Sequence, residues 1–60
     1  MIIVKLHDKR CMNGYRIDFF DTNVVTDEIV RFVKKNPKAF WIELKDKTYT
    51  DRDSFLKDYS

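Results

Sequence analysis

The sequence predicts a small two-layer α+β domain with the element order ββαββα, in which a four-stranded antiparallel sheet carries helices on one face. Two observations lead to this fold class: apolar residues alternate in several short segments, and one longer segment has an apolar stripe at helical spacing. The 60 residues are 43% hydrophobic and include five Phe, three Tyr and one Trp. This is enough apolar material for a core, and a chain of this length is expected to form a single domain over residues 1–60.

The first two strands are predicted at residues 2–6 and 15–19, where apolar and other residues alternate with a period of two. Asn13-Gly14 lies between them and is typical of a tight type I′ turn. That turn would pair residues whose numbers add up to 27, so Lys9 would face Asp18. It would also place Ile17 and Phe19 on the core face. The alternative is a seven-residue loop from Asp8 to Gly14.

The central helix is predicted to begin after Thr26, whose hydroxyl can accept a hydrogen bond from a free amide of the first turn. Ile29, Phe32 and Val33 follow at the spacing of one apolar helix face. Asn36-Pro37 is predicted to end the helix, because the residue before a proline avoids helical geometry.

The last third of the chain predicts two more strands and a second helix. Phe40, Ile42 and Leu44 alternate with polar residues or Trp41, and a turn near residues 46–47 would return residues 48–50 as a fourth strand. Residues 52–59 then form a short helix capped by Thr50 or Asp51.

Composition places the chain among reduced, cytoplasmic proteins. There is one cysteine, no apolar run approaches the length of a membrane span, and the net charge is only +2. The bias towards residues with AT-rich codons, such as Phe, Ile, Asn and Lys, leads us to expect an origin in an AT-rich bacterium or in one of its phages or plasmids. A phage protein of this kind would work in the host cytoplasm.

Catalytic chemistry is not expected, so the chain is predicted not to be an enzyme. His7 and Cys11 are the only pair resembling a base and a thiol, and a two-layer domain of this size can hardly enclose the pocket that catalysis needs. The spacing of His7, Asp8 and Cys11 matches no metal motif, and a single glycine cannot build a phosphate-binding loop. No cofactor is expected.

A partner-binding surface is expected on the sheet face away from the helices. If Ile17, Phe19, Phe40, Ile42 and Leu44 face the helices, several apolar side chains must face outward, unless the register is shifted by one residue. An exposed patch containing tryptophan is typical of interaction sites. The sequence therefore predicts a small regulatory or inhibitory protein that binds a host protein, with a homodimer as another use of the same face. The predicted contact residues are Ile3, Phe20, Val24, Trp41 and Glu43.

Nucleic-acid binding is the alternative function. Basic residues interleaved with an aromatic residue are expected at the tip of the first hairpin and at the end of the central helix, and such a tip can enter a groove. The residues predicted for this role are Lys9, Arg10, Tyr15, Arg16 and Lys35.

Overall fold

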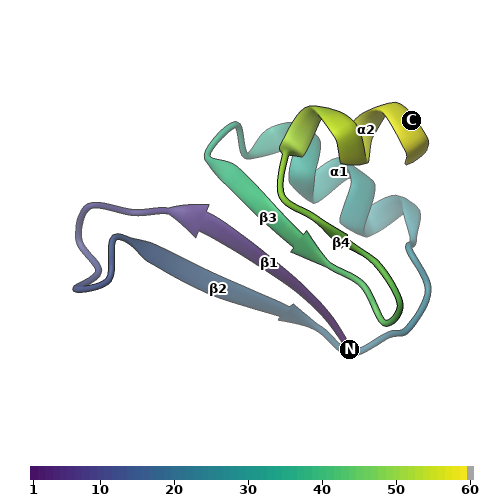
Figure 1. Ribbon diagram of the computed structural model, residues 1–60, viewed down its shortest axis with the longest axis horizontal. Coiled ribbons are helices and arrows are strands. Elements are labelled where there is room, and N and C mark those ends of the chain that lie inside the picture. Colours follow the sequence, from purple (N-terminus) through teal and green to yellow (C-terminus); the bar gives the residue numbers. More distant parts are fainter. Residues whose placement is uncertain (60) are drawn as a thin grey trace.

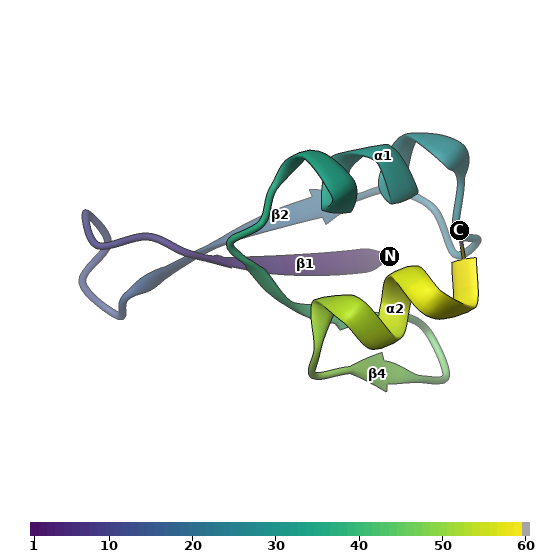
Figure 2. The same ribbon diagram turned by 90° about the horizontal axis from the view of Figure 1, so that it is seen from above.

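The computed structural model describes residues 1–59 and has the predicted ββαββα order. Its elements are β1 (Ile2–His7), β2 (Tyr15–Phe20), α1 (Asp27–Lys35), β3 (Ala39–Glu43), β4 (Thr48–Tyr49) and α2 (Arg52–Tyr59). The strands form one antiparallel sheet in the order β2-β1-β3-β4. Both helices lie on the same side of this sheet, α1 towards β2 and α2 towards β4 (Figures 1 and 2).

The core lies between the sheet and the two helices. Every second residue of β1 is buried, so Ile2, Val4 and Leu6 face the helices and the residues between them face outward. Ile29 and Val33 of α1 close the core from the other side. The complete set of buried residues is Ile2, Val4, Leu6, Ile29, Val33, Ala39, Ile42, Tyr49 and Phe55.

The pairing of β1 with β2 differs from the tight hairpin favoured by the sequence. Paired residues have numbers that add up to 22, as in Ile2 with Phe20 and Val4 with Asp18. The predicted sum is 27, so the pairing is shifted by five residues. Because five is an odd number, the shift moves every β2 side chain to the opposite face of the sheet. The expectation that Ile17 and Phe19 face the helices is therefore wrong, and so is the expectation that Phe20 faces away from them.

The loop from residue 8 to residue 14 explains this correction. The Cys11 N–H donates to the Asp8 carbonyl at 3.2 Å, and the Gly14 N–H donates to the Cys11 carbonyl at 3.0 Å. Each bond closes a turn of four residues. Gly14 has φ +82°, but no other described residue has a positive φ, whereas a type I′ turn requires two. Asn13-Gly14 thus ends the second of two turns, and the seven-residue loop is the alternative that the structure confirms.

The predicted N-cap of α1 and its predicted C-terminal end are both confirmed. The Ile29 N–H donates to the Thr26 hydroxyl at 3.4 Å, and α1 ends at Lys35, before Asn36-Pro37. Arg52 adds a contact that the sequence did not reveal, because its guanidinium donates to the carbonyls of Val33 (3.1 Å) and Lys34 (3.0 Å). A cation is favourable at the negative end of a helix dipole. The first residue of α2 therefore caps the last turn of α1.

A β-bulge in β3 corrects a second expectation. Lys5 pairs with Trp41, but Leu6 pairs with Ala39, so Phe40 has no partner in β1. An extra residue of this kind bends the strand and re-aims its side chain. The Phe40 ring stacks on the ring of His7, with centroids 4.1 Å apart. His7 alternates with the buried residues of β1, so Phe40 lies on the outward face and not against the helices.

The corrected register predicts unequal effects of one conservative change at two strand positions. Ile42→Val should lower the free energy of unfolding by about 0.5–1.5 kcal/mol, because Ile42 is completely buried. Ile17→Val should change it by less than about 0.5 kcal/mol, because Ile17 is 38% exposed. Urea denaturation at low protein concentration measures both. Equal losses at the two positions would contradict the register.

Candidate functional site

The outer face of the sheet is the face that the helices leave uncovered. Alternation along β1 and pairing across the sheet assign side chains to it, because paired residues point to the same side. Both helices pack on the other face of the sheet (Figure 1). The outer face consists of Ile3, Lys5, His7, Tyr15, Ile17, Phe19, Phe40, Trp41, Glu43 and Thr48.

Lys5 occupies the middle of the outer face. It lies on the second strand of the sheet and pairs with Ile17 on one side and Trp41 on the other. Its ammonium nitrogen lies 4.7 Å from the centroid of the Trp41 ring and 5.3 Å from that of Tyr15. Both distances are within the range of a cation–π interaction. The two rings hold the cation, and no carboxylate of the described residues forms an ion pair with it.

Aromatic and polar contacts fix the side chains around Lys5. The Phe40 ring packs between His7 and Tyr15, the latter edge-on at 5.9 Å. The Trp41 indole N–H donates to the Glu43 carboxylate at 3.4 Å. These contacts fix the orientation of the Phe40 and Trp41 rings within the chain.

The β2 part of the outer face is the most exposed. Phe19 is 61% exposed, and neither it nor Ile17 belongs to the buried core. Contiguous apolar exposure on a sheet is unusual for a free surface and typical of an interaction site. The outer face therefore combines an exposed apolar side at β2 with an ordered cation and aromatic rings at β1 and β3.

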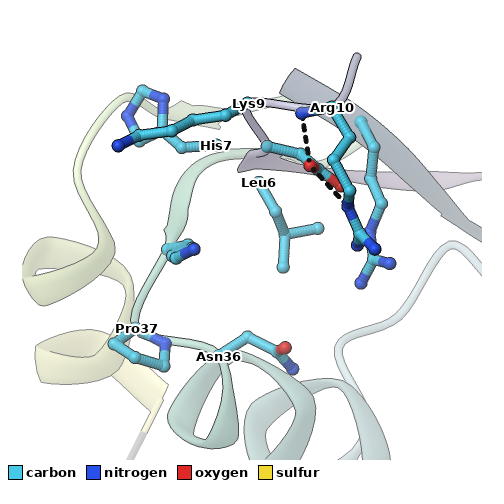
Figure 3. A pocket seen from close by; sticks show the side chains of 9 residues that line it. Leu6, His7, Lys9, Arg10, Asn36 and Pro37 are labelled. Carbon is cyan, nitrogen blue, oxygen red and sulfur yellow. Dashed lines mark hydrogen bonds and ion pairs between the residues drawn. The ribbon is translucent and has the colours of Figure 1, made fainter. Parts of the chain in front are cut away.

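A second candidate site is a cavity of about 400 Å³ where the hairpin overhangs the end of α1. In Figure 3 the hairpin residues lie across the top, Asn36 and Pro37 lie below, and Leu6 lies between them. Four cationic residues and one carboxylate line the cavity: Lys9, Arg10, Arg16, Lys38 and Asp8. We call it the hairpin pocket.

Two ion pairs neutralise part of the charge at the hairpin pocket. The Arg10 main-chain N–H and guanidinium both donate to Asp8 Oδ1, at 2.9 and 3.3 Å. These hydrogen bonds, the main-chain one foremost, hold the pKa of Asp8 below its ordinary value. The Arg16 guanidinium lies 3.6 Å from the carboxylate of Asp18. Lys9 and Lys38 have no ion pair with the described residues, so the pocket keeps an excess of positive charge.

The structure separates the residues predicted for partner binding. Ile3, Trp41 and Glu43 lie together on the outer face. Phe20 lies on the helix side instead, where its ring packs edge-on against Phe32 at 5.3 Å. Val24 is 69% exposed in the connection between β2 and α1.

The residues predicted for nucleic-acid binding are divided as well. Lys9, Arg10 and Arg16 line the hairpin pocket, whereas Tyr15 lies on the outer face. Lys35 is the last residue of α1 and does not line the pocket.

Sequence reasoning missed three residues of these sites. Lys5 could have been found, because it alternates with the buried residues of β1 and precedes a predicted core position. Phe40 could not, because no local signal marks the bulge that turns it outward. Lys38 enters the hairpin pocket only because the His7 N–H donates to its carbonyl at 3.0 Å, a contact between distant segments.

The Asp8 hydrogen bonds predict how the pKa of this group responds to mutation. Arg10→Ala removes the guanidinium but keeps the main-chain N–H, so the pKa of Asp8 should rise only part of the way to its ordinary value. Carboxyl NMR titration measures this. Because the pKa is lower in the folded state, the stabilisation is present above the unfolded pKa and is lost as the pH falls through the folded pKa. A full return to the ordinary value in Arg10→Ala would contradict the main-chain contribution.

The described residues show neither a metal-binding cluster nor a membrane-spanning helix. The described residues contain no group of three or more His, Cys, Asp or Glu side chains that could hold a metal ion. None of their helices is long and apolar enough to cross a membrane. Comparisons with models of protein families, with characterised proteins and with solved structures found no match. The outer face and the hairpin pocket are therefore the two features of the described residues from which a function can be inferred.

Proposed function

We propose that the protein is a non-enzymatic binding protein that docks a protein partner on the outer face. The observation that carries this proposal is the position of Lys5, whose ammonium lies over Trp41 and Tyr15 at the centre of an uncovered apolar sheet face. Interfaces of this composition derive most of their binding energy from a few aromatic or cationic residues that are shielded from water. A regulatory or inhibitory effect on a host protein would follow from occlusion of the docked surface.

The partner surface should be apolar and should carry a carboxylate at its centre. Lys5 is the only Lys or Arg among the outer-face residues, and Glu43 on β3 already accepts a hydrogen bond from Trp41. A carboxylate brought to Lys5 would form a charge-assisted hydrogen bond in a site that the surrounding rings partly dry. The exposed side chains of Ile17 and Phe19 would meet apolar residues beside it.

Stacking of nucleic-acid bases on the outer face is less favoured by this geometry. Bases stack on free ring faces. The Lys5 ammonium lies over the Tyr15 and Trp41 rings, and the Phe40 ring stacks on His7. The most ordered rings of this face are therefore already engaged by side chains of the same chain.

The hairpin pocket supports nucleic-acid binding as a second candidate function. Its lining includes four cationic side chains but only one carboxylate, and two lysines have no ion pair among the described residues. Such a pocket can hold phosphate groups of a backbone without reading the bases. Binding of this kind would weaken steeply with increasing salt.

One retention experiment separates the two functions. The wild-type protein and its variants are immobilised, exposed to lysate of the source organism with or without nuclease, and the retained molecules are quantified. Lys5→Glu and Trp41→Ala should each weaken partner retention, by about 30-fold if they remove a residue worth about 2 kcal/mol. Lys57→Glu makes the same charge change on α2, away from the outer face, and should leave retention unchanged.

Circular dichroism establishes that each variant is folded. Equal retention by Lys5→Glu and Lys57→Glu would contradict docking on the outer face. Retention that is lost with nuclease and with Lys9→Glu, but is indifferent to Lys5→Glu, would replace the protein-binding function by the second candidate.

A further inference from the structure

β2 is an open edge of the sheet. It pairs with β1 on one side, and no other described strand pairs with its second side. Figure 1 shows no helix or loop beyond it. β2 is six residues long, whereas β4 at the opposite edge has only two. A free edge of this length is a template on which another strand can pair.

Hydrogen bonding with β1 determines which main-chain groups of β2 point to the free side. The Asp8 N–H donates to the Gly14 carbonyl at 2.9 Å, so these two residues form a hydrogen-bonded pair. The pairs Leu6–Arg16 and Val4–Asp18 lie two and four residues further along the two strands. Hydrogen-bonded and non-hydrogen-bonded pairs alternate along antiparallel strands. The main chains of Arg16 and Asp18 therefore bond to β1. Those that point to the free edge belong to Tyr15, Ile17 and Phe19.

When two copies of β2 run antiparallel, the opposite charges and the aromatic residues of one copy lie opposite each other's counterparts in the second copy. We propose that two copies of the chain pair antiparallel along β2, with the twofold axis at Ile17. The two Ile17 residues then exchange main-chain hydrogen bonds, and Tyr15 of each copy pairs with Phe19 of the other, giving about six bonds in total. Each Arg16 faces Asp18 of the second copy in a non-hydrogen-bonded pair, where side chains are closest.

Charge selects this register over its neighbours. Pairing centred on Arg16 would place two guanidiniums opposite each other, and pairing centred on Asp18 would do the same with two carboxylates. Like charges directly opposite each other destabilise a strand pair. Charged residues usually protect an edge strand from pairing. Here a positive residue, Arg16, and a negative one, Asp18, flank Ile17. Their charges therefore destabilise the two neighbouring registers and stabilise the one centred on Ile17.

The side chains available at the edge fit the same pairing. The Arg16 and Asp18 side chains are 48% and 37% exposed as a whole, although Asp18 Oδ2, the oxygen that faces Arg16, is itself buried. Asp18 Oδ2 accepts no hydrogen bond from the described residues, and its ion pair with Arg16 at 3.6 Å is longer than a hydrogen bond. On the opposite side of the strand, Phe19 is 61% exposed and would be covered by Tyr15 of the second copy.

The resulting dimer would have one continuous sheet, with all helices on one side and the two outer faces on the other. It does not depend on the proposed partner, because it uses the edge of β2 and not the centre of the outer face. One pair of short strands buries little surface, so the association should be weak and should depend on concentration.

Charge reversal tests the proposal without requiring a known ligand. Sedimentation equilibrium of the wild type from about 10 µM to about 1 mM should show a reversible dimer. Arg16→Asp and Asp18→Arg should each raise the dissociation constant by at least about tenfold, because each brings like charges together. An equimolar mixture of these two variants should dimerise again, since every cross-strand pair in the mixed dimer joins an Asp to an Arg. No interaction within one chain can produce this recovery.

A monomeric wild type at about 1 mM would overturn the proposal. So would a dimer that is indifferent to either reversal, or a mixture that stays monomeric. If a reversed variant does not fold, the double variant Arg16→Asp/Asp18→Arg restores the ion pair and should dimerise like the wild type. Ile17→Pro provides a second test, because it removes an N–H that points to the free edge, where proline is tolerated. This variant should be monomeric.

Discussion

The packing of Phe20 against Phe32 is the contact on which both faces of the sheet depend. It places Phe20 on the helix side, opposite Ile2, and thereby sets the pairing of β1 with β2. Because side chains alternate along a strand, a shift of one residue would exchange the two faces of β2. This partly buried ring contact therefore also determines that Ile17 and Phe19 point away from the core.

Two different surfaces follow from this register. Side chains alternate along β1, which places Lys5 on the outer face beside Trp41. The bulge in β3 turns Phe40 to the same side. At the free edge, the same register directs the main chain of Ile17 outward and leaves Arg16 and Asp18 on the helix side, beyond the buried core. One surface suits a partner with an acidic apolar patch, and the other suits a second copy of the chain.

Much of the fold could be predicted from local sequence signals, because these signals report local physics. The Thr26 cap, the stripe of Ile29 and Val33, and the stop at Asn36-Pro37 each depend on residues a few positions apart, and α1 follows them closely. Asp51 caps α2 in the same way, accepting from the Asp53 N–H and the Ser54 hydroxyl. Trp41 and Ile3 could be assigned to the outer face because each alternates with a buried neighbour.

The remaining errors arise where distant residues compete with a local preference. Asn13-Gly14 favours a tight turn, but that turn would take Phe20 away from Phe32. The bulge at Phe40 depends on the pairing of two strands that are far apart in the sequence. The capping of α1 by Arg52 likewise joins elements that only the folded chain brings together.

NMR of the strand pair tests the register most directly. In antiparallel sheets, α-protons approach closely across non-hydrogen-bonded pairs, whose Cα atoms are about 4.5 Å apart. The account predicts strong contacts between the α-protons of Lys5 and Ile17 and between those of Ile3 and Phe19. Strong contacts between the α-protons of Arg16 and Cys11 and between those of Asp18 and Lys9, the non-hydrogen-bonded pairs of a tight turn at Asn13-Gly14, would contradict it. In that case the outer face and the free edge would both have to be assigned anew.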